Sequence, residues 1–171
     1  DSSSFNLKHL NIFKDIKTPI IFVSGNHEFY IKDSSKKLKK LHNYNLTYLD
    51  NKNFIFKNLN IIGLGDNKTI SQQKLIVNQL IIEKKFNLVL VHKPSTGDHV
   101  NQKIDLMLSG HTHRGQIFPF NFFVHLKFKY IYGLYEKLNS KLYVSSGSGC
   151  WGPNMRLGSK NEIVEVIISS K

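Results

Sequence analysis

The chain of 171 residues is long enough to bury one sizeable hydrophobic core, and its 40% hydrophobic and 21% charged residues are typical of a folded domain rather than a disordered one. A single cysteine, Cys150, excludes an internal disulfide, and no apolar run reaches the roughly 20 residues that a membrane-spanning helix needs. The formal net charge of +12 favours anionic partners, although a solvated, lysine-rich surface is the simpler explanation.

Short apolar runs and helical patterns alternate along the first two thirds of the chain. In chain order, the predicted elements are a helical pattern at Phe5, Leu10, Phe13 and Ile16; a strand over 19–24; a lysine-rich helix over 34–42 capped by Asp33 or Ser34; two strands over 53–64; an amphipathic helix over 71–85; and strands over 86–91 and 104–109. The runs PIIFVS (19–24) and FNLVLV (86–91) are apolar throughout, which is typical of strands buried on both faces.

Helical patterns are scarce after residue 109. A hairpin is predicted with strands over 134–137 and 142–145 and a turn over 138–140, and a last strand over 162–168. Strand–helix alternation followed by a hairpin predicts a mixed α/β fold, with two mixed β-sheets packed face to face and flanked by helices.

Three of the predicted strands end in a loop that opens with asparagine or histidine. The strand over 19–24 continues into GNHE (25–28), the strand over 86–91 into His92, and the strand over 104–109 into GHTH (110–113). Because strand ends on one edge of a sheet converge, these side chains can share one cleft. An asparagine carbonyl and several imidazoles form an oxygen and nitrogen ligand set suited to Mn, Fe or Zn.

Each motif alone has a structural explanation, since Gly-Asn-His commonly forms a turn and a single histidine after a strand is commonly a surface residue. The ordered set of all three motifs is far more specific than any one member. The remaining histidines lack a comparable context, and we interpret them as surface residues: His9, His42, His99 and His125.

The ordered set GNHE, His92 and GHTH resembles the calcineurin-like metallophosphoesterase superfamily. The resemblance implies that Asn26, His92 and His111 bind one metal ion and that His113 binds its neighbour. It also implies that His27 faces the phosphate as a catalytic residue, which stabilises or protonates the leaving group.

The tail is similar to one bacterial branch of that superfamily, which contains membrane-associated members. In that branch GHTH continues into a segment like GQIFPF (115–120), and a glycine-rich loop with an arginine, here 146–156, precedes the last strand. A membrane-associated bacterial protein is therefore expected.

The first two motifs of the superfamily, Asp-x-His and Gly-Asp-x-x-Asp, do not occur in the chain. Asp66 follows Gly65, but it comes after GNHE, and we interpret it as part of a strand-ending turn. The spacing to GNHE makes Asp1 the expected last aspartate of Gly-Asp-x-x-Asp. Residues 1–171 are then expected to be the C-terminal portion of a single metallophosphoesterase domain, without its first strands and its bridging carboxylate. We expect the two divalent ions of the parent to be absent or only partly retained here, with little turnover.

Two features outside the motifs bear on the substrate. Arg114 directly follows GHTH and Arg156 lies in the glycine-rich stretch, so both are candidates to bind phosphate, with a surface ion pair as the alternative. The segment 117–135 is rich in Phe and Tyr and contains Lys127 and Lys129. It is compatible with a membrane surface, with stacking on nucleic-acid bases, or with core packing of the second sheet.

These observations favour a metal-dependent hydrolase of phosphomonoesters or phosphodiesters, acting on a phosphorylated small molecule or lipid. The alternatives are a non-catalytic binding module on the same fold and a charge-driven nucleic-acid binder, for which no recognised motif is present. Self-association through an exposed sheet edge is a further expectation, since uncovered edges pair readily.

Overall fold

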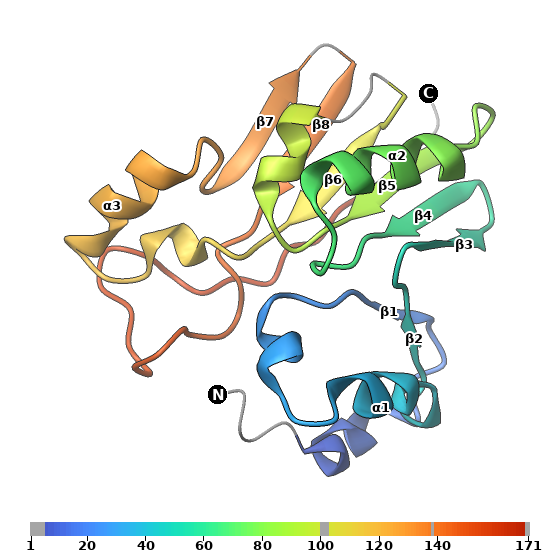
Figure 1. The fold of residues 1–171 in the computed structure, drawn as a ribbon, viewed down its shortest axis with the longest axis horizontal. Helices are drawn as coiled ribbons and strands as arrows, with labels where there is room; N and C mark the ends of the chain where they lie inside the picture. Colours follow the sequence, from blue (N-terminus) through green and yellow to red (C-terminus); the bar gives the residue numbers. More distant parts are fainter. Residues whose placement is uncertain (1–5, 100–102, 138, 170–171) are drawn as a thin grey trace.

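The computed structural model describes residues 6–99, 103–137 and 139–169, and these form a mixed α/β fold with two sheets flanked by helices (Figure 1). β1 and β2 form a two-stranded sheet, and the other sheet has six strands in the order β3-β4-β5-β6-β8-β7. The strands are β1 (Ile20–Phe22), β2 (Leu46–Tyr48), β3 (Lys52–Phe56), β4 (Leu59–Gly63), β5 (Phe86–Leu90), β6 (Leu106–Ser109), β7 (Gly133–Lys137) and β8 (Ser140–Val144). The predicted fold class is confirmed. Asp1, the expected end of the Gly-Asp-x-x-Asp motif, lies outside the described residues.

Short helices connect the strands, and α2 covers one face of the large sheet (Figure 1). The helices are η2 (Leu7–Phe13), η3 (His27–Tyr30), α1 (Ser34–Lys39), η4 (Leu41–Tyr44), α2 (Ile70–Leu80), η5 (Pro94–His99), η6 (His113–Gly115) and α3 (Phe120–Lys127). Over the ranges that the structure describes, none of them is long and apolar enough to cross a membrane.

The strand directions determine where the loops meet. β4, β5, β6 and β8 run parallel, with Gly63 beside Leu90, Leu90 beside Leu108, and Ser109 beside Val144. Their carboxyl ends therefore lie on one edge of the sheet, where the loops after β4, β5 and β6 come together. The predicted strands over 53–64, 86–91 and 104–109 and the hairpin of β7 and β8 are confirmed, although Leu138 of the turn is not described.

Two apolar clusters support the two sheets. The larger one packs α2, through the fully buried Val77, against Ile62, Val89 and Val144 of the six-stranded sheet. The smaller one joins α1, η4 and β2 to β1 through Leu38, Leu41 and Leu46. Gly63 lets the two parts approach, because a Cβ at this position would lie 2.2 Å from Cβ of Leu49 and 3.0 Å from Val23.

A buried amide network joins α2 to the sheet. Nδ2 of the fully buried Asn60 donates to the Leu80 carbonyl and to Oδ1 of Asn87, each at 2.8 Å, while its Oδ1 accepts from Asn53 at 2.9 Å. The Asn87 side chain in turn accepts a hydrogen bond from the Ile82 N–H at 3.0 Å and donates one to the Ile82 carbonyl at 3.1 Å. These bonds satisfy polar groups that would otherwise be costly to bury, and they explain why α2 ends at Leu80 rather than at the predicted residue 85.

Several sequence predictions about local structure are wrong. Residues 162–168, predicted as a strand, have no regular secondary structure and pair with no strand in the described part of the chain. The helix predicted over 34–42 breaks into α1 and η4, and the pattern starting at Phe5 becomes the 3₁₀ helix η2, with Phe5 itself outside the described residues. β2, η5 and α3 were not predicted; core packing of the segment 117–135 is wrong for α3, whose phenylalanines are exposed.

β1 and β5 are less buried than predicted. All three residues of β1 are half-buried, and β5 alternates between buried and half-buried side chains. The face of the large sheet opposite α2 is therefore only partly covered by the described residues. Self-association through an exposed edge stays a prediction; the outer strands of the large sheet are β3 and β7.

We expect Asn60→Asp to lower the free energy of unfolding by about 2–4 kcal/mol. The substitution keeps the shape but replaces an amide donor with a carboxylate that faces two acceptors, the Leu80 carbonyl and Asn87. Urea unfolding followed by circular dichroism measures the effect. Asn43→Asp, at an exposed position, is the matched control and should change the free energy of unfolding by less than about 0.5 kcal/mol. Equal stability of the two variants would contradict the role given to this network.

Candidate metal and phosphate site

The backbone of the GNHE loop after β1 packs closely against the His92 ring. A Cβ at Gly25 would lie 2.8 Å from the His92 ring, so only glycine lets the loop backbone pass there. The Gly25 N–H donates to Oε2 of Glu28 at 2.6 Å, which closes the loop on itself. Asn26 is thereby placed over the end of β5.

Three donor atoms meet at this edge of the sheet. Nε2 of His92 lies 2.8 Å from Oδ1 of Asn26 and 2.9 Å from Nδ1 of His111. The two imidazole rings pack edge to face, with centroids 4.7 Å apart. The predicted convergence of these three side chains is present in the structure; their role as metal ligands stays a prediction.

The GHTH loop is held in a conformation that few sequences adopt. The Gly110 N–H donates to the His92 carbonyl at 3.0 Å, which extends the pairing of β5 and β6 beyond the strands. His111 and His113 then have positive φ angles of 70° and 49°, in the left-handed region. The buried Thr112 hydroxyl fixes the loop by donating to the Ile131 carbonyl at 2.6 Å. Such strained backbone is commonly found at functional sites.

Burial keeps the two central imidazoles neutral. It lowers the pKa of His92 to about 3, with the nearby His111 and Lys93 adding to the effect. It likewise lowers the pKa of His111 to about 4, with Lys93 adding to the effect and Asp66 opposing it. Both rings therefore carry no charge at neutral pH, and their lone pairs are available to a metal ion.

The donor set fits a transition-metal ion. Ligands at the Zn–N distance of about 2.1 Å lie roughly 3.0–3.4 Å from one another, so the 2.8 and 2.9 Å separations need only a small outward shift. Two imidazoles and an amide oxygen suit Mn, Fe or Zn. In the described ranges no three His, Cys, Asp or Glu side chains lie close enough to hold one metal ion together, so no carboxylate joins the two histidines as a ligand.

His113 lies beside this cluster and is held by Arg156. The Arg156 guanidinium donates to the His113 carbonyl at 3.2 Å and approaches its Nδ1 at 3.4 Å. The same group donates to the carbonyls of Ser146 and Gly149, so it fastens the glycine-rich loop to GHTH. Burial, together with Arg156 and His27, lowers the pKa of His113. These contacts occupy much of the guanidinium, and the predicted phosphate contact of Arg156 remains untested.

His27 and Arg114 lie at the exposed side of the site. His27 is exposed and packs edge to face on Tyr30 at 5.7 Å, yet its charge affects both His92 and His113. The Arg114 guanidinium stacks on the Tyr132 ring at 4.3 Å and is in no ion pair found in the described residues. The other histidines whose side chains are described are exposed, as predicted: His9, His42 and His125. The His99 side chain is not described.

Sequence reasoning missed the contribution of Asp66. Its carboxylate, only 4% exposed, forms an ion pair with Lys93 at 2.8 Å, and its charge raises the pKa of His111. Because β4 is parallel to β5 and β6, the loop after β4 ends at the same edge. The convergence of strand ends, which predicted that His92 and His111 lie close together, therefore applies to Asp66 as well. From the sequence alone, Asp66 is interpreted only as part of a turn.

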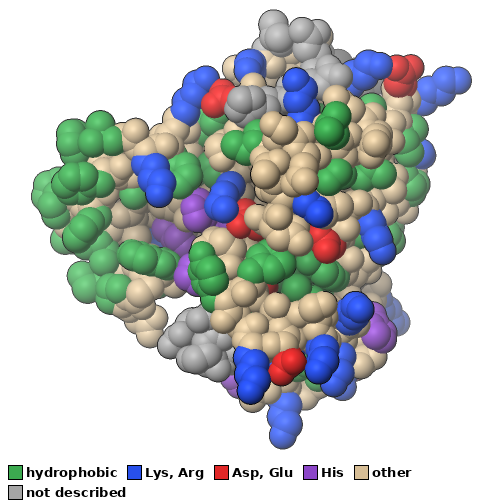
Figure 2. Space-filling view, viewed as in Figure 1, with side chains coloured by type: hydrophobic (Ala, Val, Ile, Leu, Met, Phe, Trp, Pro, Cys, Tyr) green, Lys and Arg blue, Asp and Glu red, His purple; other side chains and the backbone are tan. Residues whose placement is uncertain are grey.

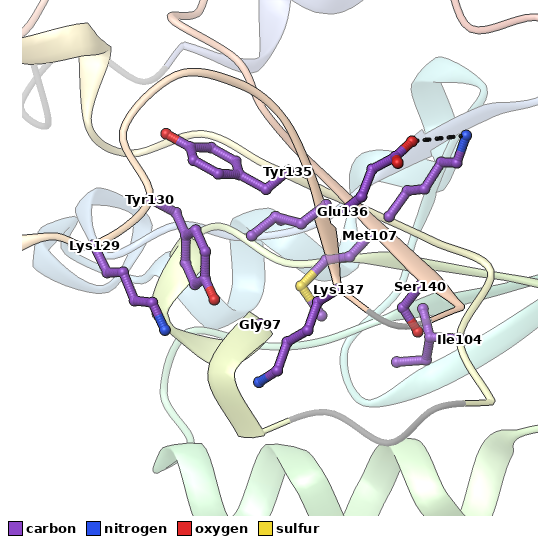
Figure 3. A pocket seen from close by; sticks show the side chains of 11 residues that line it. Gly97, Ile104, Met107, Lys129, Tyr130, Tyr135, Glu136, Lys137 and Ser140 are labelled. Atoms are coloured by element: carbon purple, nitrogen blue, oxygen red, sulfur yellow. Dashed lines mark ion pairs between the residues drawn. The ribbon is translucent and has the colours of Figure 1, made fainter.

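A separate cavity of about 400 Å³ lies beside η5, β6, β7 and β8 (Figure 3). Tyr130 and Tyr135 form one wall, with ring centroids 5.0 Å apart, and Lys141 pairs with Glu136 at 3.1 Å. None of the candidate site residues lines it.

Comparison with known proteins identifies the family. The family model of calcineurin-like phosphoesterases matches residues 1–115, which contain GNHE, His92 and GHTH. The chain belongs to this family. Members of the family generally use divalent metal ions, in agreement with the donor set described above.

The similar proteins are all named as metallophosphoesterases or as proteins with a metallophosphoesterase domain. The chain is 37% identical to an uncharacterized metallophosphoesterase of Campylobacter jejuni over 88% of its length and 42% of the relative, and 36% identical to one of Helicobacter pylori over 83% and 40%. It is 31% identical to a transmembrane protein with metallophosphoesterase domain of Bos taurus, over 87% of the chain and 38% of the relative. The chain thus spans about two fifths of the length of these proteins. No solved structure matches it.

We expect the chain, in the presence of a chelator, to lose thermal stability as the pH falls from about 6.5 to 4. In the unfolded state His92 and His111 take up protons near pH 6.5, whereas in the folded state their pKa values are about 3 and 4, so acid favours unfolding. Melting temperatures of the wild type and of His92→Asn/His111→Asn across this range measure the effect, and the variant should show the shallower decline.

The double variant His9→Asn/His42→Asn is the control, since both residues are exposed. It should follow the wild-type decline. The same decline in all three proteins would mean that carboxylates alone cause the acid sensitivity.

Proposed function

We propose that the intact protein hydrolyses phosphomonoesters or phosphodiesters with a dinuclear divalent metal centre. Asn26, His92 and His111 would bind one ion and His113 the other. The observation that carries the proposal is the convergence of Oδ1 of Asn26 and Nδ1 of His111 on Nε2 of His92, at 2.8 and 2.9 Å. The family match and the metallophosphoesterase relatives support it.

The proposed chemistry assigns each residue a separate role. When bound, the two ions would polarise the phosphate and lower the pKa of a water molecule. The neutral rings of His92 and His111 offer lone pairs without the charge repulsion that imidazolium would cause. His27, exposed beside them, can hold a proton for the leaving group or stabilise its developing charge. Arg114 can donate to a phosphate oxygen at the exposed side.

Further ligands would have to come from outside the described residues. The three neutral donors offset none of the charge of a divalent cation, and the described residues add no carboxylate to the two histidines. We propose that a bridging carboxylate is supplied by other sequence of the intact protein. The unpaired segment 162–168 and the partly covered face of the large sheet leave space in which additional strands could pack.

The substrate is proposed at the level of chemical class, as a phosphorylated small molecule or lipid, and the metal as Mn, Fe or Zn. Histidine ligation disfavours Mg, which prefers oxygen ligands. A non-catalytic binding module would have no need of the neutral pair of His92 and His111 beside Asn26, so hydrolysis is the function that this geometry supports best.

We expect His27→Ala to lower the turnover of an aryl phosphodiester roughly 10²-fold in the intact protein, including any sequence that flanks the 171 residues. Metal content should stay at the wild-type level, because His27 is proposed to act on the substrate. His92→Asn should lose metal and activity together. Steady-state kinetics with Mn²⁺ and elemental analysis of the same preparations measure both effects.

His125→Ala is the control, an exposed histidine outside the site. It should behave as the wild type. Metal loss in His27→Ala would make this residue a ligand instead of a proton donor, and undiminished turnover in His92→Asn would overturn the proposed centre. The 171-residue chain alone should be nearly inactive; robust turnover by this chain as a monomer would contradict the need for further ligands.

A further inference from the structure

A surface of exposed apolar side chains lies beside the candidate site. Figure 2 shows two hydrophobic groups on one side of the molecule, with histidine side chains in the hollow between them. We call this surface the apolar rim, and its members are 50–71% exposed: Phe118, Phe120, Phe122, Phe123, Leu126, Trp151, Met155 and Leu157. At this exposure its two groups together present on the order of 800 Å² of apolar area, a size that commonly marks an interaction surface.

The two halves of the apolar rim are bound to each other. The Gln116 side chain donates to the Trp151 carbonyl at 2.7 Å and accepts from the Trp151 N–H at 2.6 Å. The Phe118 N–H donates to the Leu157 carbonyl at 2.8 Å, and the Leu157 N–H donates to the Gln116 carbonyl at 2.9 Å. These hydrogen bonds hold the backbone of the apolar rim in a defined conformation. Its side chains are therefore exposed in a folded part of the protein and not in unstructured loops.

The same surface is directly connected to the candidate ligands. Gln116 is the third residue after GHTH. Arg156, one residue before Leu157, joins the second half of the apolar rim to His113 through a hydrogen bond to its carbonyl. α3 begins at Phe120 and ends at Lys127. A partner bound to the apolar rim would therefore lie next to the candidate metal and phosphate site.

The charged residues around the apolar rim indicate which class of partner it binds. Neither 112–135 nor 147–160, which together contain the whole apolar rim, has an Asp or Glu. The basic residues in them are Arg114, Lys127, Lys129, Arg156 and Lys160. Lys129 pairs with Asp98 at 2.7 Å and Arg156 donates to backbone carbonyls, so Arg114, Lys127 and Lys160 provide the positive charge beside the apolar rim. A second copy bound through the same face would bring these cations together, since a two-fold dimer opposes identical surfaces. An apolar surface flanked by cations matches the interface of an anionic bilayer, where aromatic rings enter the acyl boundary and lysines reach the headgroups.

We propose that the apolar rim docks the protein on the surface of a membrane that contains anionic lipids, with α3 and the loop around Trp151 entering the interface. The candidate site then faces the headgroup layer, and its substrate is the phosphate of a lipid headgroup. This choice of substrate rests on the proposed function, whereas the docking does not.

Trp151 reports the docking without any substitution, because it is the one tryptophan of the chain and lies in the apolar rim. Adding vesicles of phosphatidylcholine with about 30% phosphatidylglycerol should shift its emission to shorter wavelength, and pure phosphatidylcholine should shift it far less. Unchanged emission with the anionic vesicles would overturn the proposal.

Sedimentation with the same vesicles tests which surface binds. The triple variant Phe120→Ser/Phe122→Ser/Phe123→Ser should bind the anionic vesicles at least about tenfold more weakly than the wild type. The control Ile12→Ser/Leu75→Ser removes side chains that are 73% and 62% exposed outside the apolar rim, and it should bind as the wild type does. Equal binding by wild type and triple variant would overturn the proposal, as would a wild-type dimer that the triple variant turns into a monomer.

These outcomes are separable from those of the proposed function. Vesicle binding needs no turnover, so it can succeed while the hydrolysis of a soluble aryl phosphodiester fails. If the soluble ester is hydrolysed and the vesicles are not bound, the proposed function stands and the docking is wrong.

Discussion

The parallel pairing of β4, β5 and β6 is the constraint on which the site depends. It places the ends of these strands on one edge of the large sheet, so that residues far apart in the sequence meet there. His92 and His111 each lie just beyond such an end. Asn26 reaches them from the small sheet only because Gly25 has no side chain to strike the His92 ring. Packing and topology, rather than local sequence, thus bring the three donor atoms together.

Burial then decides the chemistry of these donors. An imidazole in water is partly protonated near neutral pH, and a protonated ring cannot bind a metal ion. Enclosure by the loops lowers the pKa of His92 to about 3 and that of His111 to about 4. Neutral rings alone do not offset the charge of a cation, however. The metal centre proposed above would therefore need further, charged ligands, which the described residues do not add to His92 and His111.

The sequence predicted the parts of the fold that rest on local patterns. Short apolar runs located β4, β5 and β6, although β5 is only partly buried, and the motifs after β5 and β6 indicated His92 and His111. What failed depends on distant partners. Residues 162–168 have the composition of a strand, but a strand needs a neighbour, and the described residues provide none.

Two other features also depended on the three-dimensional structure. For the phenylalanines of α3 the sequence left a membrane surface, base stacking and core packing open. The structure excludes core packing, because these side chains are exposed. Asp66 lies in a turn after β4, as predicted, and the position of β4 in the sheet brings that turn to the site, which the sequence alone did not indicate. Order along the chain is a weaker guide to a site than the edge of the sheet on which a loop ends.

The central claim is that Asn26, His92 and His111 bind one divalent ion. A crystal structure of the protein grown with Zn²⁺, with anomalous scattering recorded at the zinc edge, tests it most directly. The account requires an anomalous peak about 2.0–2.2 Å from Oδ1 of Asn26, Nε2 of His92 and Nδ1 of His111. Zinc bound elsewhere, with these three atoms still in contact with one another and free of metal, would contradict it.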